Sequence, residues 1–463
     1  MGASSYRLFS VSDEITAPLH FGYLASSIPT KHEVILIDQL RHGNSDVALL
    51  RSIVKARPDI LGFSIKSKDV SQTKKMLLQI RPLLQHAKIV VGGPQMSLMP
   101  CETFKYFDGC IDFGFAGESE IGFSKFLGVV DEKNADSELE NIPNLVWTAH
   151  GQIKTNARMI LENLDSLPFP RWEIMVPASY PKAPHGAFYN QYPYAPMITS
   201  RGCPYACTFC SAGELSGKRM RYRSVDNVFE EIKYLNSHFG VKEIHFEDDN
   251  FSVNKKRAID LSERLLTENL GITWAFPNGL RLGGLDLDTL KLMRKAGCYA
   301  VNVGIESGND ERLRKIKKRT TKAQIRENVS RAKKAGLDVG GFFIIGFPGE
   351  KLSEMRNTIN FALELELDRI GLSYFQPYPG SEDYKTLCEA GNYRFDFDKS
   401  KHSLHTVSFV PGQIGEKRFR RIRRKGFLKF YFRPRIIMRL ILRIRSFEHL
   451  RYILKRGIRW LSN

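Results

Sequence analysis

The feature that most constrains the fold is a run of three cysteines within eight residues, Cys203, Cys207 and Cys210, at the spacing C-x3-C-x2-C. Gly202 and Pro204 place this run in a loop. Thiolates this close in sequence can bind one soft metal centre, either zinc or an iron-sulfur cluster. A zinc site normally has four protein ligands, and no second Cys or His pair stands nearby at zinc-finger spacing. We therefore predict a [4Fe-4S] cluster with one open iron, with a zinc knuckle or a chance grouping of thiols as the alternative.

With Phe209 directly before the last cysteine, the motif resembles the signature of the radical S-adenosylmethionine (SAM) superfamily. The resemblance implies that the open iron chelates the amino and carboxylate groups of SAM. One electron from the cluster then splits SAM into methionine and a 5′-deoxyadenosyl radical, which abstracts hydrogen from the substrate. The electron would come from a donor such as a flavodoxin or a ferredoxin.

The length and composition are those of a globular protein with more than one domain. The 463 residues are 42% hydrophobic and 26% charged. No apolar run approaches the length of a membrane span, and the first 13 residues lack the basic start and apolar stretch of a secretory signal. The seven cysteines are an odd number, and three of them are needed as free ligands. We therefore expect a reducing cytoplasm and no disulfide framework.

Residues 1–130 alternate between short apolar segments and amphipathic segments with helical spacing. The predicted strands are 6–11, 33–37, 60–65, 88–91 and 112–116, and the predicted helices are 19–27, 47–56, 70–84 and 118–127. This alternation indicates a doubly wound parallel sheet of the flavodoxin-like type. Such sheets bind ligands beyond the carboxyl ends of their strands. We therefore expect the loops 64–68, 92–96 and 117–120 to lie at the ligand site.

The order of these segments and their glycines resemble the cobalamin-binding domain that precedes the radical SAM core in many enzymes. The matching stretches are 17–25, 32–38, 58–62, 90–94 and 117–120. In that family the corrin lies over the strand ends. This implies cobalamin contacts from Ser64, Lys66, Gly92, Gly93, Gln95, Gly117 and Glu118.

The chain departs from the family pattern at two places. The motif D-x-H-x-x-G, whose histidine ligates cobalt, is missing, because Asp13 and His20 do not have that spacing. Gln95 stands where relatives often carry a histidine. Many radical SAM relatives also lack the lower histidine, so cobalamin remains the prediction. The alternative is a flavodoxin-like domain that holds no ligand or only a substrate.

Residues 131–194 are predicted to link this domain to the next. Residues 144–148 and 152–154 form a small hairpin, and the prolines of 164–172 stiffen the connection that follows. The aromatic, proline-rich residues 180–196 could cover the mouth of an active site.

Residues 195–400 carry six further strand-and-helix units. The predicted strands are 195–199, 244–247, 273–276, 301–308, 340–345 and 372–376. The cysteine loop follows the first strand directly, and strand carboxyl ends are where α/β barrels place their chemistry. We predict a partial TIM-like (β/α)6 barrel, open on one side to admit a large substrate.

The candidate SAM contacts lie at the ends of these strands. Acids after the second strand could accept hydrogen bonds from the SAM ammonium or ribose, with a solvated turn or helix cap as the alternative. The resemblance implies that Glu306 contacts the ribose and that Gly346 lines the adenine site. The predicted SAM-binding residues are Phe209, Glu247, Asp249, Glu306, Gly346 and Gln376. We interpret His245 and Cys298 as core residues.

The net charge of +19 is concentrated in the tail, residues 401–463. From Glu416 onward there are 17 of the 69 Lys and Arg residues but only 2 of the 50 Asp and Glu residues, so the body is close to neutral. Apolar residues recur at helical spacing, and Arg435, Arg439 and Arg443 form an i, i+4 stripe. The pattern predicts a basic amphipathic helix, broken near Pro434.

Three interpretations of this helix remain open. It could bind anionic lipid peripherally on the inner face of the membrane. It could dock on the barrel with a solvated basic face. It could bind RNA, although nucleic acid is the least expected partner.

The favoured function is methyl transfer to an unactivated carbon of a lipid or natural product. The radical removes a hydrogen, and the substrate radical takes methyl from methylcobalamin. Oxidative cyclisation or rearrangement uses the same cluster without producing S-adenosylhomocysteine. An RNA methylthiotransferase would carry a second set of three cysteines in the first domain, where only Cys101 and Cys110 stand. A non-enzymatic iron-sulfur protein would leave the barrel pattern unexplained.

Overall fold

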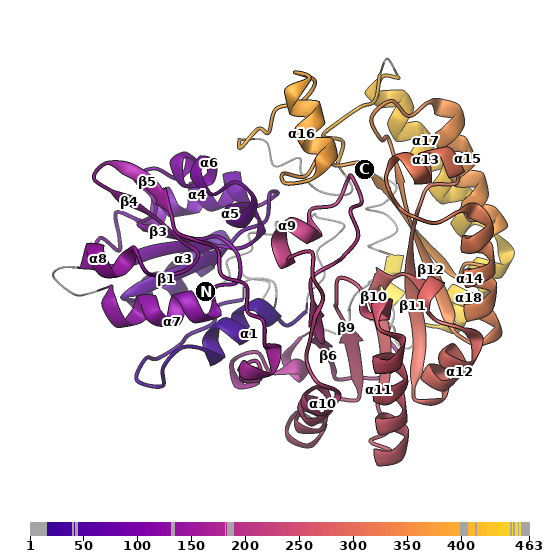
Figure 1. The fold of residues 1–463 in the computed structure, drawn as a ribbon, viewed down its shortest axis with the longest axis horizontal. Helices are drawn as coiled ribbons and strands as arrows, with labels where there is room; N and C mark the ends of the chain where they lie inside the picture. The colour runs from indigo at the N-terminus through magenta and orange to yellow at the C-terminus, as the bar shows by residue number, and fades with distance from the viewer. Residues whose placement is uncertain are drawn as a thin grey trace.

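The computed structural model describes residues 16–38, 41, 45–130, 135–180, 182, 189–398, 406–412, 414–444, 447, 450–451 and 453–454. The strand predicted at 6–11 lies outside these residues. The described chain forms two α/β bodies, an amino-terminal domain and a larger open barrel, which face each other (Figure 1).

The sheet of the amino-terminal domain is mixed. Its strands, in spatial order, are β1 (Ile60–Ser64), β2 (Lys88–Gly92), β3 (Phe113–Phe115), β4 (Leu145–Ala149) and β5 (Gln152–Thr155). The first three run parallel, whereas β4 and β5 form an antiparallel hairpin beside β3. The hairpin that the sequence places in a linker therefore extends this sheet.

Helices cover both faces of this sheet. They are α1 (Leu19–Ser26), α3 (Asp46–Ala56), α4 (Val70–Ile80), α5 (Pro94–Leu98), α6 (Pro100–Tyr106), α7 (Glu120–Val129) and the short α8 (Ala135–Leu139). Leu61 and Phe63 of β1 pack in the core under α3 and α4, and Ile60 packs in the core under α7. Successive strand residues face opposite sides, so one short apolar strand serves two cores.

Two local predictions for this domain are wrong. Residues 33–37 form no strand, and Asp38 alone makes a bridge. Leu36 packs against the barrel core and Ile37 against the first domain's core, so this stretch runs between the two bodies. The expected loop after Gly93 is the helix α5, which begins at Pro94 because proline suits the first helical position.

The barrel contains the six predicted strands, all parallel. In spatial order they are β13 (Arg369–Tyr374), β12 (Asp338–Ile345), β11 (Cys298–Glu306), β10 (Thr273–Leu280), β9 (Glu243–Phe246) and β6 (Tyr194–Met197). The sheet remains open between β13 and β6. Cys298 and His245 are both buried in it, as predicted.

The outer face of the barrel is covered by helices with strong start signals. They include α10 (Val225–Phe239), α11 (Lys255–Glu268), α12 (Leu287–Lys295), α14 (Lys322–Lys334) and α15 (Leu352–Glu364). Ser224, Asn254, Asp286 and Thr321 each cap one of the first four by accepting a hydrogen bond from a backbone N–H of the first turn. These caps fix where each helix begins and so where each strand-end loop lies.

The first helix of the tail, α17 (Glu416–Tyr431), packs on the edge strand β13. It lies beside α15 on the outside of the barrel (Figure 1). The Tyr431 hydroxyl bonds both the N–H and the C=O of Ile370, and Arg423 donates to the carbonyl of Leu372 at 2.7 Å. These bonds satisfy backbone groups that an edge strand would otherwise expose. Docking on the barrel is therefore confirmed for α17, and α18 (Pro434–Leu442) begins at the predicted break. No helix in the described ranges is long and apolar enough to cross a membrane.

Candidate functional site

The cysteine loop lies between the two strands of a small antiparallel ribbon. After β6 the chain forms β7 (Ser200–Arg201), which pairs with β8 (Arg221–Tyr222). Between them Gly202 has a φ of +97°, and a Cβ added there would lie 2.2 Å from the carbonyl oxygen of Arg219. Only glycine fits this position, and it turns the chain into the loop that carries the cysteines.

All three cysteines of the loop are free thiols. Burial raises the pKa of Cys203 and raises that of Cys210 to about 11. In the described part of the chain no three His, Cys, Asp or Glu side chains converge tightly enough to hold a single ion. The ligands of a [4Fe-4S] cluster lie farther apart than those of a single ion, because each cysteine binds a different iron. The donor set of three thiols with no further ligand fits such a cluster better than zinc.

Arg281 is held against the cysteine loop. Its guanidinium donates to the Cys207 sulfur at 3.3 Å and to the carbonyl of Lys318 at 2.7 Å. It also lies over the ring of Tyr205, 3.6 Å from the ring centre. Hydrogen bonds to cluster sulfur influence the reduction potential, so Arg281 is positioned to tune the cluster. In the sequence it is only an arginine beyond the third barrel strand.

A cavity of about 810 Å³ lies between the two bodies. Its size is near the upper end of the range of roughly 300–1,000 Å³ for ligand pockets, so it suits a large ligand. Its lining from the first domain includes Ser64, Gly92, Gly93, Gly117 and Glu118, which are five of the residues predicted to contact cobalamin. Its lining from the barrel includes Ser200, Arg201, Glu247 and Asp249.

Gly93 is required by close packing of the chain against Ser64 and Ile65 at the end of β1. Gly93 has a φ of +93°, and a Cβ there would lie 2.7 Å from the backbone nitrogen of Ile65. Lys66 and Gln95 are not part of the cavity lining. Gln95 is buried in α5, where its amide nitrogen donates to the Thr103 hydroxyl at 3.3 Å. Because α5 starts at Pro94, the side chain that follows turns into the domain.

His20 lines the cavity although it lacks the motif spacing of a cobalt ligand. Its side chain is exposed to the cavity and does not pack in the core, since it is not among the buried residues of α1.

The acids after β9 divide into two roles. Asp248 is buried and accepts hydrogen bonds from the Thr199 backbone and hydroxyl at 3.1 and 2.8 Å, so it fixes the end of β6. Glu247 and Asp249 line the cavity beside the cysteine loop. Burial raises the pKa of Asp249, and hydrogen bonds from Ser216 and Gly202 oppose that shift. The structure thus brings two of the predicted SAM contacts together.

The other predicted SAM contacts lie outside the cavity lining. Glu306 has a φ of +65° and pairs with Lys318 at 2.7 Å, with 9% of each side chain exposed. Phe209 packs edge-on against Phe347 with ring centres 5.7 Å apart, next to Gly346.

Residues of the tail cover Gly346 and Gln376. A Cβ on Gly346 would lie 2.3 Å from the Phe419 ring of α17. The Gln376 amide donates to the Thr406 carbonyl at 2.6 Å. The sequence shows no sign of this cover, because the tail contacts come from residues 30 or more positions away.

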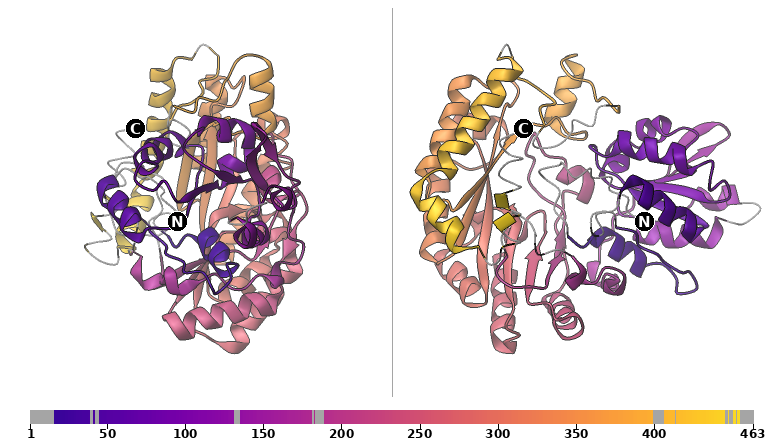
Figure 2. Two further views of the ribbon diagram at one scale, coloured as in Figure 1. Left: turned by 90° about the vertical axis from the view of Figure 1, so that its left-hand side faces the viewer. Right: turned by 180° about the vertical axis from the view of Figure 1, so that it is seen from behind.

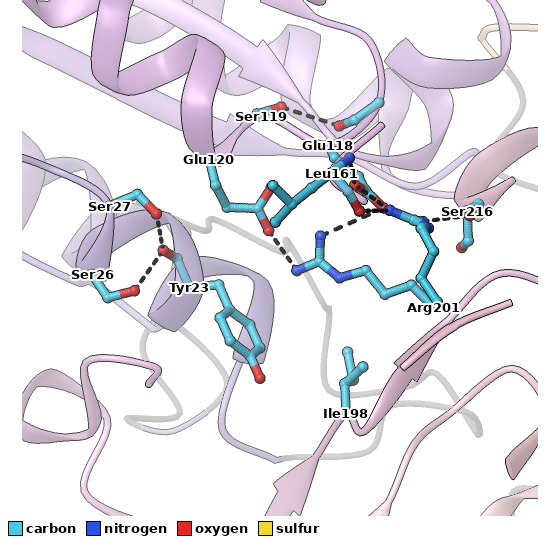
Figure 3. A network of polar contacts seen from close by, with 12 residues as sticks. Tyr23, Ser26, Ser27, Glu118, Ser119, Glu120, Leu161, Ile198, Arg201 and Ser216 are labelled. Carbon is cyan, nitrogen blue, oxygen red and sulfur yellow. Dashed lines mark hydrogen bonds and ion pairs between the residues drawn. The ribbon is translucent and has the colours of Figure 1, made fainter. Parts of the chain in front are cut away.

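A buried ion-pair network joins the two bodies at the cavity wall (Figure 3). Arg221 donates to both carboxylate oxygens of Glu118 at 2.6 and 2.8 Å. Arg201, its partner in the β7–β8 ribbon, binds Glu120 at 2.6 Å and lies 3.6 Å from Glu118. Burial raises the pKa of Glu118, but the two arginines and the Leu161 N–H outweigh burial and leave it below its usual range. The carboxylate is therefore ionised and clamps the first domain to the base of the cysteine loop.

Of the residues in this clamp, only Glu118 was predicted from the sequence as a site residue. The available signal was weak: Arg201 directly precedes the cysteine loop, and Arg221 stands 20 residues later with no periodic pattern.

Comparison with known proteins agrees with both halves of this site. Residues 197–362 match the model of the Radical SAM superfamily, and residues 8–127 match the B12 binding domain. An uncharacterized methyltransferase of Pyrococcus horikoshii is 33% identical over 445 residues, which cover 96% of this chain and 93% of the relative. The chain belongs to the cobalamin-dependent radical SAM enzymes. Its cofactors are a [4Fe-4S] cluster, SAM and cobalamin.

More distant relatives differ in the reaction they catalyse. The cytidylyl-2-hydroxyethylphosphonate methyltransferase of Streptomyces wedmorensis is 27% identical, covering 86% of this chain and 82% of the relative. The anaerobic magnesium-protoporphyrin IX monomethyl ester cyclase of Rubrivivax gelatinosus is 25% identical, and the match covers 82% of this chain and 66% of the relative. The family therefore includes methyltransferases and cyclases.

Solved structures share the fold. OxsB, a cobalamin-dependent SAM radical enzyme with aqua-cobalamin bound, gives a TM-score of 0.74 at 16% identity, covering 98% of this chain and 71% of the other. The methyltransferase TsrM of Kitasatospora setae, with cobalamin and a [4Fe-4S] cluster bound, gives a TM-score of 0.67 at 18% identity. That match covers 81% of this chain and 75% of the other. Both support the arrangement of an amino-terminal B12-binding domain against a partial barrel.

Proposed function

We propose that this enzyme transfers a methyl group from SAM to an unactivated carbon of a small-molecule or lipid substrate. The observation that carries the proposal is the shared cavity. One space is lined by the strand ends of the B12-binding domain and by Glu247 and Asp249 next to the cysteine loop. Such a space would bring a methyl carrier and a radical source to one substrate.

The chain's own residues would bind and orient the cofactors. Cys203, Cys207 and Cys210 would ligate the cluster and leave one iron for SAM. Glu247 and Asp249 would accept hydrogen bonds from SAM, while the backbone at Gly92, Gly93 and Gly117 would allow close approach of cobalamin. When bound, cobalamin supplies a carrier that accepts a methyl group from one SAM and gives it to a carbon radical.

The overall reaction balances with two SAM molecules. One substrate C–H bond, two SAM and two electrons give one C–CH3 bond, S-adenosylhomocysteine, methionine and 5′-deoxyadenosine. A flavodoxin or ferredoxin would supply the electrons. We place this reaction in the cytoplasm, where thiol ligands stay reduced.

The test uses SAM with a deuterated methyl group and substrate pools extracted from cells. The anaerobic holoenzyme is incubated with a polar fraction and a lipid fraction, and products are compared by mass spectrometry. Methyl transfer predicts a product carrying the deuterated methyl group, together with equal amounts of S-adenosylhomocysteine and 5′-deoxyadenosine. A Cys207→Ala variant, which lacks a cluster ligand, should form none of these.

Oxidative cyclisation is the second candidate, because a cyclase is among the relatives. It predicts 5′-deoxyadenosine without S-adenosylhomocysteine and a product that has lost hydrogen and gained no label. That result would replace the methyl-transfer proposal. TsrM has been solved with tryptophan as substrate, which supports including amino acids and other small polar molecules in the first fraction tested.

A further inference from the structure

The helix α18 presents an apolar face to solvent. Ile437, Met438, Ile441 and Leu442 share this face through their i, i+4 spacing, and they are 39–76% exposed. Phe432 before the helix is 69% exposed, and Phe447 after it is 82% exposed. Single exposed apolar residues are ordinary, but a contiguous group of them marks an interaction surface.

Contacts on the opposite side fix this orientation. Ile436 is buried, and Leu440 packs against the barrel core. Arg439 and Arg443 form ion pairs with Asp368 and Asp338. Two members of the predicted arginine stripe thus bind the barrel, and the apolar residues are the ones left outward.

The neighbouring surface is strongly basic. The solvent face of α17 carries Lys417, Arg418, Arg421, Arg424, Lys425 and Lys429, and Arg435 continues it at the start of α18. The only acid within α17 is Glu416. Burial, together with the positive charges of Arg439, Arg435 and Arg443, lowers the pKa of Lys333 to about 8. Cations are therefore in excess over anions on this side of the barrel.

The two helices follow each other along the outer side of the barrel, at the yellow end of the colour scale (Figure 2). Near the start of α17, Phe419 contacts Gly346, just after the carboxyl end of β12. At the end of α17, Tyr431 contacts Ile370, near the start of β13. The acids bound by α18 stand at the amino ends of the same strands. No residue of α17 or α18 lines the cavity. A partner bound here would leave the cavity uncovered.

We propose that α17 and α18 form a docking surface for an anionic lipid bilayer. The apolar face of α18, with Phe432, would enter the headgroup and acyl boundary, while the basic face of α17 would contact lipid phosphates. A second copy of the chain is a poorer occupant, because pairing two such surfaces would bring like charges together. RNA would engage the basic residues but would leave the apolar face in water.

The test is flotation of the full-length holoenzyme with vesicles. One set contains phosphatidylcholine alone, and the other contains equal parts of phosphatidylcholine and phosphatidylglycerol. The proposal predicts binding to the anionic vesicles, at least tenfold weaker binding to the neutral ones, and weakening by salt. Ile441→Ser with Leu442→Ser should lower binding to anionic vesicles at least tenfold.

The matched control is Leu78→Ser with Leu83→Ser on the first domain, since these leucines are 57% and 55% exposed. This control should bind vesicles like the wild type. Both double variants should cleave SAM to 5′-deoxyadenosine at the wild-type rate, which shows that they are folded.

Three results would overturn the proposal. One is failure of the wild type to bind anionic vesicles. Another is equal binding by the Ile441→Ser, Leu442→Ser variant. The third is a wild-type dimer that binds no vesicles and becomes monomeric in that variant, which would assign the surface to a second copy. None of these readouts depends on the reaction, so they are independent of the proposed methyl transfer.

Discussion

The clamp between the two bodies predicts a large stability effect at Glu118. Glu118 and Arg221 have side-chain exposures of 12% and 2%, and two hydrogen bonds join them. Removing one charge of a buried pair leaves the other without compensation, at a cost of ~3–5 kcal/mol. Glu118→Gln keeps the shape but removes the charge, so we expect a loss of about 3 kcal/mol in the free energy of unfolding.

Glu140→Gln is the matched control in the same domain. Glu140 pairs with Lys154 at 2.6 Å, but these side chains are 55% and 40% exposed. An exposed pair contributes about 0–1 kcal/mol. Both variants would be compared with the wild type by urea unfolding, with far-ultraviolet circular dichroism as the signal. Equal effects of the two variants would refute the argument that burial makes the Glu118 pair strong.

The stabilisation by Glu118 should also depend on pH. The pKa of Glu118 is lowered in the folded protein, so its contribution is present above the unfolded value of 4.5 and is lost as pH falls through the folded pKa. The difference between wild type and Glu118→Gln should therefore be full at pH 7 and shrink under acidic conditions. A difference that grows on acidification would contradict the assignment.

Three further predictions concern the cysteine loop, Arg281 and Glu350. Gly202→Ala places a Cβ 2.2 Å from the Arg219 carbonyl, so we expect iron incorporation to fall at least tenfold. Gly391→Ala is the control for this clash, because Gly391 also has a positive φ, +68°, but a Cβ there meets nothing within 4 Å, so the variant should still incorporate iron. Arg281→Gln removes a charged hydrogen-bond donor from the Cys207 sulfur, so the reduction potential of the cluster should become more negative. Redox titration monitored by electron paramagnetic resonance measures this potential. Arg281→Lys, which keeps the charge, should show a smaller shift. An unchanged potential in Arg281→Gln would exclude that role. Burial raises the pKa of Glu350 to about 7, so this carboxyl group stabilises the folded state most when it is protonated. The difference in unfolding free energy between wild type and Glu350→Gln should therefore change by up to ~3 kcal/mol, to the disadvantage of the wild type, as pH rises from 4.5 to about 7. Unfolding measurements across that range check this, and a difference that does not depend on pH would contradict it.

The barrel could be predicted from the sequence because its strands are short runs rich in apolar residues. β6 is buried along its whole length, and β13 alternates between buried and half-buried residues. The cysteine loop follows β6 after only the two-residue strand β7, so its placement near a strand end needed no long-range information. Residues 33–37 have the same apolar character, but they divide their contacts between two cores, which local periodicity does not report.

The residues that assemble the cavity wall could not be predicted in the same way. Arg221 and Glu118 are 103 positions apart, and their pairing depends on how the ribbon after β6 meets the first domain. Gln95 was predicted to contact cobalamin because it stands where relatives often carry a histidine, yet the helix that starts at Pro94 turns its side chain into the domain. The sequence left open whether the tail docks on the barrel, and the contact of α17 with β13, 40 or more positions away, decides this point.

The most direct test of the central claim follows the methyl group of SAM without requiring the substrate. The holoenzyme, reconstituted with iron, sulfide and cobalamin, is incubated anaerobically with reductant and SAM that carries a deuterated methyl group. The bound corrin is then extracted and analysed by mass spectrometry beside the SAM products. Our account predicts deuterated methyl on the corrin together with S-adenosylhomocysteine. Conversion of SAM to only 5′-deoxyadenosine and methionine, with an unlabelled corrin, would contradict it.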